Sequence, residues 1–165
     1  MPTYALITGA SGGIGYEFAH ELARRKMNVL LVARSFDKLA ELKNELINQY
    51  RIQCDFIAMD LSTPDAANQL YEWCMVNQYE IDILINNAGY GLFGYFEKQD
   101  ALEVLNMMQL NMNTMVKLCH NFLPMLKSKP SAYILNVAST ASYQAVPTLS
   151  VYAATKAFVV LFTRG

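Results

Sequence analysis

A tyrosine and a lysine stand four positions apart near the end of the chain, in Tyr152-Ala-Ala-Thr-Lys156. In a helix, this spacing places both side chains on the same face. A phenol titrates at about pH 10, and a neighbouring ammonium favours the phenolate form. The pair is therefore suited to acid–base chemistry at neutral pH, although a lone pair of this kind is common.

Ser139 follows an apolar run at residues 133–137 that predicts a strand. Its hydroxyl is suited to donate a hydrogen bond to a carbonyl oxygen of a substrate. Parallel α/β sheets bind ligands at the carboxyl ends of their strands, which is where this serine is expected to lie. The sequence therefore predicts a reaction at a carbonyl group, with Ser139 as a stabilising donor.

A glycine-rich segment joins the first predicted strand to the first predicted helix. Glycines let the backbone turn sharply and approach a diphosphate, and a helix N-terminus presents free N–H groups. The spacing is Gly9-x3-Gly13-x-Gly15, not the G-x-G-x-x-G of the usual dinucleotide fingerprint. We expect a dinucleotide site here, with glycines used only for packing as the alternative. Its expected residues are Gly9, Ser11, Gly13, Ile14 and Gly15.

Arg34 ends the second predicted strand, 19 positions after Gly15. An acidic residue about 20 positions after the glycines binds the adenosine ribose of NAD, whereas an arginine accommodates the 2′-phosphate of NADP. Because no acid stands at this strand end, we expect NADP, with NAD less favoured. Asp60 and Leu61 follow the third predicted strand. There, Asp60 is expected either to bind the adenine amino group or to cap a turn.

The elements that position these residues alternate along the chain. Apolar runs that are mostly continuous are typical of strands covered on both faces, and helical patterns lie between them. This alternation predicts an α/β fold with a parallel sheet. The strands are expected at residues 4–8, 29–33, 55–59, 81–85 and 133–137. Five helices are expected: one from Ile14, one after an N-cap at Ser35, one from Thr63-Pro64, one from about Leu102 to Met125, and one from about Ser150.

In combination, these residues resemble the short-chain dehydrogenase/reductase family. The motifs occur in the family's order and at its spacing, with 13 residues from Ser139 to Tyr152, and they span nearly the whole chain. They are Thr8-Gly9-x3-Gly13-Ile14-Gly15, Asn86-Asn87-Ala88-Gly89, Ser139 and Tyr152-x3-Lys156. The resemblance implies a Rossmann-type, doubly wound parallel sheet with helices on both faces. It also implies NAD(P)-dependent interconversion of a carbonyl and an alcohol by hydride transfer.

The resemblance further implies roles for individual residues. Tyr152 would act as the acid/base, Lys156 would hold the nicotinamide ribose and favour the phenolate, and Ser139 would orient the carbonyl. Asn111 would support a water in the proton relay, with a hydrogen-bonded core amide as the alternative. Residues 87–89, which are Asn87, Ala88 and Gly89, would border the cofactor, and Asn87 would either contact it or support the sheet.

Aromatic residues follow the fourth predicted strand, and further apolar residues follow Ser139. We expect them to line an apolar cleft for a small carbonyl or alcohol substrate, with simple packing as the alternative. They are Tyr90, Phe93, Tyr95, Phe96, Tyr143, Val146 and Pro147.

Composition limits the other classes of function. The chain has 165 residues, 13 basic and 14 acidic, so its net charge of −1 argues against nucleic-acid binding. Three separated cysteines and two isolated histidines predict neither a disulfide framework nor a metal site. Free thiols are typical of a reducing compartment, so we expect a cytoplasmic protein. No apolar run approaches the ~20 residues that span a bilayer, and residues 1–5 lack signal-peptide character, so no membrane partner is expected.

The last third of the chain has an unusual charge pattern. Residues 104–165 contain no Asp or Glu, which we interpret as burial in the core or in a subunit interface, rather than as a basic patch. The helices at 102–126 and 150–165 are apolar around most of their circumference, and in the family they form a dimer interface. A homo-oligomer is therefore expected.

The family pattern continues beyond Gly165 with two more strands and a substrate lid. We therefore expect residues 1–165 to form a single dinucleotide-binding domain that is incomplete at its C-terminus. Its fifth strand would lie at a sheet edge, where an apolar sequence favours aggregation unless it is covered. The alternative to an enzyme is a non-catalytic nucleotide-binding or oligomerising fragment.

Overall fold

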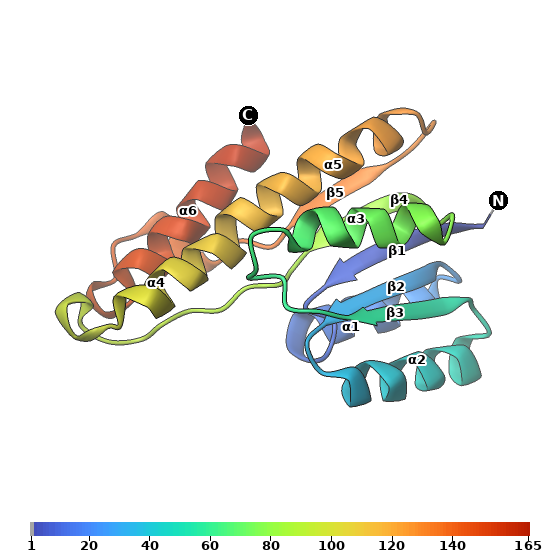
Figure 1. The fold of residues 1–165 in the computed structure, drawn as a ribbon, viewed down its shortest axis with the longest axis horizontal. Helices are drawn as coiled ribbons and strands as arrows, with labels where there is room; N and C mark the ends of the chain where they lie inside the picture. The colour runs from blue at the N-terminus through green and yellow to red at the C-terminus, as the bar shows by residue number, and fades with distance from the viewer. Residues whose placement is uncertain (1) are drawn as a thin grey trace.

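A computed structural model describes residues 2–165, in which five parallel strands form one sheet in the order β3-β2-β1-β4-β5 (Figure 1). Each predicted strand is present within one residue of its expected bounds. The chain leaves β3 at one edge and returns beside β1 as β4, so the sheet is doubly wound, as predicted. The strands are Thr3–Thr8 (β1), Asn28–Ala33 (β2), Cys54–Ala58 (β3), Glu80–Asn86 (β4) and Tyr133–Asn136 (β5).

Helices cover both faces of this sheet, with α1 and α2 on one side and α3 and α5 on the other (Figure 1). A π-helical segment, η2, joins α4 to α5. The helices are Gly13–Arg24 (α1), Phe36–Tyr50 (α2), Ala66–Val76 (α3), Ala101–Met108 (α4), Gln109–Thr114 (η2), Met115–Lys127 (α5) and Ser150–Arg164 (α6). Short 3-10 turns occur at Phe96–Lys98 (η1), Thr140–Tyr143 (η3) and Pro147–Leu149 (η4).

Two apolar clusters sandwich the sheet because successive strand residues point to opposite faces. In β1, Ala5 and Ile7 pack with α1 and α2, whereas Tyr4 and Leu6 pack with α3 and α5. Completely burying one such aliphatic side chain contributes about 1.5–3 kcal/mol. The two clusters therefore fix β1, and with it the turn that follows Thr8.

A much smaller apolar cluster holds α6 against the rest of the molecule. Its buried members are Met115, Cys119 and Val159. No residue between Lys127 and Tyr152 is buried. Of the two kinds of burial expected for the last third, burial in the core is therefore not found for most of its residues, and burial in a subunit interface stays a prediction. Residues 104–165 carry few charges because many of their side chains are apolar, and several of these apolar side chains remain accessible to solvent in this chain.

Strand β5 lies at the edge of the sheet, as predicted. Its side chains Tyr133 and Leu135 are 64% and 40% exposed. An edge strand with exposed apolar residues can pair with further strands.

Three local expectations differ from the structure. Helix α3 begins at Ala66 and not at Thr63-Pro64, because the carboxylate of Asp60 holds a turn by accepting from the Ser62 N–H at 2.9 Å. Ser35 is the N-cap of α2, as predicted, but its side chain makes no capping hydrogen bond. The helix expected from Leu102 to Met125 is interrupted by η2, which no feature of the hydrophobic pattern indicates.

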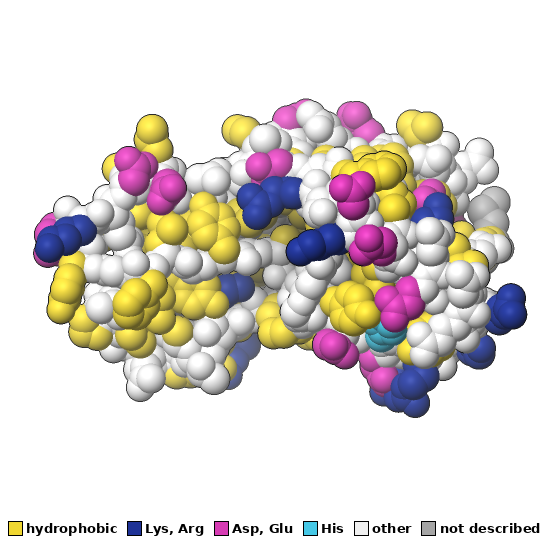
Figure 2. Space-filling model, turned by 90° about the horizontal axis from the view of Figure 1, so that it is seen from below, with side chains coloured by type: hydrophobic (Ala, Val, Ile, Leu, Met, Phe, Trp, Pro, Cys, Tyr) yellow, Lys and Arg dark blue, Asp and Glu magenta, His cyan; other side chains and the backbone are white. Residues whose placement is uncertain are grey.

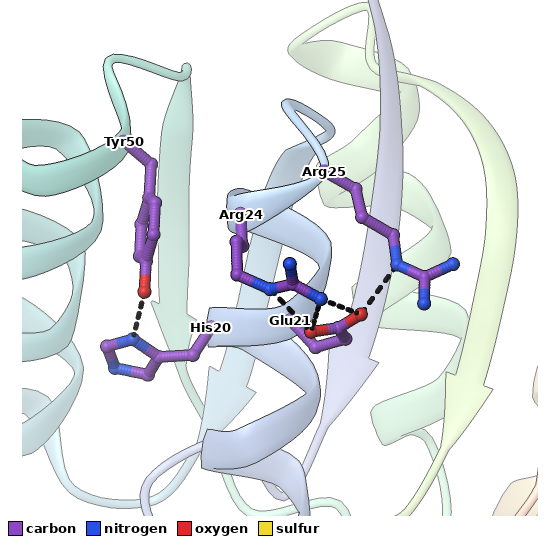
Figure 3. Close-up of polar contacts among 5 residues, drawn as sticks. All are labelled: His20, Glu21, Arg24, Arg25 and Tyr50. Atoms are coloured by element: carbon purple, nitrogen blue, oxygen red, sulfur yellow. Dashed lines mark hydrogen bonds and ion pairs between the residues drawn. The ribbon is translucent and has the colours of Figure 1, made fainter.

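Polar contacts join side chains of α1 to one another and to α2 (Figure 3). His20 Nδ1 lies 3.3 Å from the Tyr50 hydroxyl of α2, and Glu21 accepts from both Arg24 and Arg25. Within residues 2–165, no three His, Cys, Asp or Glu side chains gather as metal ligands would. In the same residues, no helix combines the length and the apolar character needed to cross a bilayer.

Candidate active site

The glycine turn after β1 leaves open space at the N-terminus of α1. Gly9 and Gly13 adopt φ values of +68° and +55°, which favour glycine, and a β-carbon on Gly13 would meet no atom within 4 Å. The N-cap residue, Gly12, has no side chain to cap the helix, and the first turn contains no acid. The free N–H groups of this turn are thus available to an anion, and the residues fit the diphosphate of a dinucleotide.

Hydrogen bonds from the neighbouring strand hold this turn in place. Asn87 Nδ2 donates to the carbonyl oxygens of Thr8 and Gly9 at 3.0 and 3.2 Å. The Thr8 hydroxyl accepts from the backbone N–H groups of Asn87 and Ala88. These contacts favour a supporting role for Asn87. Gly15 is buried against the turn, where a β-carbon would lie 2.3 Å from the Gly9 carbonyl oxygen.

A cleft of about 840 Å³ runs from this turn across the carboxyl ends of the first four strands. It gathers many of the residues expected to bind a dinucleotide. These are Gly9, Ser11, Arg34, Asp60, Leu61, Ala88 and Gly89. Gly13, Ile14 and Gly15 lie beside it at the start of α1, where the Ile14 side chain is exposed.

Other residues of this cleft were not identified from the sequence. Ser35 and Lys38 stand at its β2 end, next to Arg34, and place a second positive charge there. Lys38 follows Arg34 by four positions, so a second basic residue close to the predicted strand end was a usable signal. Glu103 and Asn106 line the cleft from α4, and no local motif marks them.

Asp60 is held in its ionised form at the edge of the cleft. Hydrogen bonds from the Ser62 backbone and then from its hydroxyl lower the pKa of Asp60, and the charge of Arg34 lowers it further. The structure thus shows Asp60 capping a turn, which was one of its two expected roles. Its position in the cleft lining leaves the second role compatible with this geometry.

Tyr152 and Lys156 lie on the first turns of α6. Lys156 is only 6% exposed, and its ammonium donates to the Val137 carbonyl oxygen at 2.8 Å. Burial lowers the pKa of Lys156, and no carboxylate within residues 2–165 pairs with it. The lysine therefore supplies a buried positive charge close to the end of β5.

The segment after β4 brings this pair to the end of the cleft. A β-carbon on Gly89 would lie 3.4 Å from Lys156 Nζ, and one on Gly91 would lie 3.0 Å from the Tyr152 ring. Gly89 also lines the cleft. The cleft and the tyrosine–lysine pair are therefore adjacent. A side chain at position 89 would press on Asn111 Oδ1, which lies 2.8 Å from the added β-carbon, and one at position 91 would press on the Tyr152 ring.

Asn111 lies in η2 and is almost completely buried. Its amide accepts from the Tyr90 N–H and donates to the Tyr90 carbonyl oxygen at 2.9 Å and to the Thr155 hydroxyl at 3.1 Å. Both N–H groups of this amide and one lone pair of its oxygen are used within the protein, as in the hydrogen-bonded core amide that was the alternative, and the role in the relay stays a prediction. Thr155, which the sequence did not single out, thereby connects Asn111 to α6.

Ser139 caps the short turn η3. Its hydroxyl oxygen accepts from the Ala141 N–H at 3.1 Å. Within the described chain its hydroxyl proton has no acceptor, so that proton can be donated to a ligand.

The residues expected to form one apolar cleft are divided. Tyr143, Val146 and Pro147 line a second cleft of about 510 Å³ with Ala153, Ala154 and Ala157 of α6, whereas Tyr90 lines the first. Phe93, Tyr95 and Phe96 line neither and are exposed. The expected single cleft is therefore wrong for residues 2–165. Figure 2 shows hydrophobic side chains gathered on the half of the molecule away from the N-terminus, with most charged side chains over the other half.

Comparison with known proteins agrees with this geometry. A model of the short chain dehydrogenase family matches residues 3–165. Very-long-chain 3-oxoacyl-CoA reductase-A of Danio rerio is 34% identical over 166 residues, which cover 98% of this chain and 51% of the relative. The chain thus spans about half the length of the relatives it matches.

Solved structures share the fold as well. A short-chain dehydrogenase from Sphingobium yanoikuyae in complex with NADPH has a TM-score of 0.92 and 32% identity, covering 100% of this chain and 64% of that one. The bulky-bulky ketone specific alcohol dehydrogenase of Comamonas testosteroni gives the same TM-score and identity, covering 100% and 66%. From its fold, its motifs and these matches, the chain belongs to the short-chain dehydrogenase family.

Proposed function

We propose that this chain forms the nucleotide-binding and reactive part of an NADP(H)-dependent oxidoreductase that interconverts a carbonyl and an alcohol. The observation that carries this proposal is the position of Gly89 and Gly91. One lines the long cleft next to Lys156, and the other contacts the Tyr152 ring. A cofactor bound along the cleft would therefore end beside a proton donor and a buried cation.

Each reactive residue has a distinct task in this proposal. Tyr152 donates its phenolic proton to the carbonyl oxygen, and the buried charge of Lys156 stabilises the phenolate that remains. Ser139 donates its free hydroxyl proton to the same oxygen and stabilises the developing negative charge. The nicotinamide of NADPH, when bound, supplies the hydride. Asn111 and Thr155 hold α6 against the segment after β4.

NADP is favoured over NAD by the charges at the β2 end of the cleft. Arg34 and Lys38 both lie there and suit a 2′-phosphate. Asp60, which lines the same cleft, is already hydrogen-bonded to Ser62. The structural relative from Sphingobium yanoikuyae, which is in complex with NADPH, supports the same choice.

For the substrate, we propose the 3-oxo group of a long-chain acyl thioester. The names of the relatives support this class. The apolar lining of the second cleft and the exposed aromatic residues after β4 suit a long hydrocarbon chain. A bulky ketone is the competing class, supported by the structural relative from Comamonas testosteroni.

The test compares three forms of the full-length protein: wild type, Tyr152→Phe and the control Tyr133→Phe, which is exposed on β5 and lines neither cleft. NADPH and NADH are each offered with 3-oxopalmitoyl-CoA and, separately, with a diaryl ketone. We expect NADPH oxidation with the thioester, a loss of about 10²–10⁴-fold in Tyr152→Phe, and little change in the control. NADPH affinity should stay within twofold in both variants. Unchanged turnover in Tyr152→Phe would refute the role of Tyr152 as proton donor. Binding of NADPH without turnover of either substrate would support the non-catalytic alternative.

We also propose that α4, α5 and α6 form a contact between copies of the chain. These helices expose large apolar side chains that nothing covers within residues 2–165, among them Leu102, Leu105 and Leu161. Such exposure is typical of an interaction surface. Leu105→Asp and Leu161→Asp should lower the mass seen by analytical ultracentrifugation, whereas Val76→Asp on α3 should not. Equal masses for all variants would refute this contact.

A further inference from the structure

A triangle of polar side chains lies where β4, β5 and α5 meet. Asn86 Nδ2 donates to Asn136 Oδ1 at 2.8 Å and to Cys119 Sγ at 3.3 Å. The Cys119 thiol in turn donates to Asn136 Oδ1 at 3.7 Å. Burial raises the pKa of Cys119, so the thiol keeps the proton that it donates. All three sides of the triangle are therefore hydrogen-bonded, in a region where Asn86 and Cys119 are buried.

Asn136 extends this triangle to the second half of α6. Its Nδ2 donates to the Thr163 hydroxyl at 3.0 Å, and that hydroxyl donates to the Val159 carbonyl oxygen. The Asn136 amide on β5 thus connects to three other elements. Its oxygen accepts hydrogen bonds from Asn86 of β4 and Cys119 of α5, and its nitrogen donates to Thr163 of α6.

The polar link matters because α6 has few apolar contacts. Its buried cluster is small, and its first half is held by the hydrogen bonds of Lys156 to Val137 and of Asn111 to Thr155. The Val137 N–H also donates to the Asn86 carbonyl oxygen at 3.0 Å. Val137, whose carbonyl oxygen receives Lys156, is therefore tied to β4 through its own N–H.

We infer that Asn136 is a positioning residue for the reaction. Through Asn86, Cys119 and Thr163 it sets where α6 lies over the end of β5, and so where Lys156 and Tyr152 stand relative to Ser139. It touches neither substrate nor cofactor in this arrangement. The inference deepens the proposed function and rests on it for its kinetic readout.

The test uses the full-length protein with Asn136→Leu, which has a similar volume and no hydrogen bonds, and Thr163→Val, which breaks only the link to α6. Asn113→Leu, at an exposed position of η2, is the matched control. The rate of 3-hydroxypalmitoyl-CoA oxidation by NADP⁺ is measured from pH 6 to 10. We expect Asn136→Leu to lower kcat at pH 7 by about tenfold or more, while KM for NADP⁺ stays within twofold. The pH of half-maximal turnover should move upward, because a displaced Lys156 favours the phenolate less.

Thr163→Val should show the same changes to a smaller extent, and the double variant should be no worse than Asn136→Leu alone, since both act through one contact. A purely structural residue would lower the melting temperature and leave kcat and the pH profile unchanged, and that result would overturn the inference. If the wild-type protein does not oxidise the thioester, the proposed function fails on its own. The positioning role is then tested by amide hydrogen exchange of residues 157–164. Exchange that is faster than wild type in Asn136→Leu and Thr163→Val, but not in Asn113→Leu, supports this role. Equal exchange in all forms refutes it.

Discussion

The ammonium of Lys156 donates a hydrogen bond to the carbonyl oxygen of Val137 at 2.8 Å. Val137 follows β5 directly and precedes Ser139 by two positions, so this contact connects the helix of the tyrosine–lysine pair to the segment of the serine. In the proposed function, Tyr152 and Ser139 act on the same carbonyl oxygen. Tyr152 belongs to α6 and Ser139 to the segment after β5, and the buried Lys156 connects these two parts of the chain. That arrangement places a charge in a desolvated position, which has a measurable cost.

Replacing Lys156 with Met should change how stability depends on pH. Burial lowers the pKa of Lys156 in the folded chain below its ordinary value of 10.5. Between these two pKa values the unfolded chain binds the extra proton, so the free energy of unfolding rises as pH rises through that interval. The melting temperature of Lys156→Met relative to wild type should therefore be highest near pH 7 and should fall as pH approaches 10.5. A difference that stays constant from pH 7 to 10.5 would show that the ammonium is not desolvated.

Replacing Arg34 with Leu should weaken NADPH binding selectively. A hydrogen bond to a charged group contributes about 1.5–3 kcal/mol, so we expect about a 10–100-fold loss of NADPH affinity by calorimetry. NADH, which lacks the 2′-phosphate, should bind within twofold of wild type. Arg24→Leu is the matched control, because Arg24 pairs with Glu21 on the surface of α1 (Figure 3). Equal losses for the two nucleotides would contradict a role for Arg34 in choosing between them.

Two glycines of the turn after β1 should differ in how much stability they lose on substitution by alanine. In Gly15→Ala the new β-carbon would lie 2.3 Å from the Gly9 carbonyl oxygen, so the turn must shift. Overpacking of this kind costs about 1–3 kcal/mol, which should lower the melting temperature by several degrees. In Gly12→Ala the backbone is extended and no atom lies within 4 Å, so stability should change by less than about 0.5 kcal/mol. Similar melting temperatures for the two variants would argue against this close packing.

The three cysteines should resist alkylation in the folded protein. Burial raises the pKa of both Cys54 and Cys74 to about 12, and it also raises the pKa of Cys119. The thiolate is the reactive form, so brief treatment with iodoacetamide at pH 8 should label none of the three. Peptide mapping after denaturation should then find all three labelled. Rapid labelling of Cys119 in the native state would indicate that the Asn86–Cys119–Asn136 triangle opens.

The sequence was most informative where residues close together in the chain determine the structure. The glycine turn is an example, since Gly9 and Gly13 take left-handed conformations that few other residues adopt. The Tyr152–Lys156 pair is another, because a spacing of four fixes a common helix face. The strands were also predictable, because a strand covered on both faces must be apolar throughout.

Contacts between distant parts of the chain were not predictable. Asn111 reaches Thr155 across 44 positions and Asn86 reaches Asn136 across 50, and no local pattern marks either pair. The aromatic residues after β4 were expected to meet those after Ser139. The structure separates them because Tyr90 turns towards the first cleft, whereas Tyr143 lines the second. The start of α3 was misplaced because a side-chain turn at Asp60 outweighed the preference of proline for the first helical position.

The π-helical segment η2 has a consequence for how this chain can change during evolution. A π turn holds one residue more than an α turn, and each α-helical residue advances the helix by about 100°. The segment therefore rotates α5 relative to α4, so that Asn111 meets Thr155 while Leu118 and Phe122 still face the sheet. Losing one residue here would turn one of these two faces away from its neighbours. Insertions and deletions should thus be excluded from Gln109–Thr114, while substitutions at its exposed positions remain tolerated.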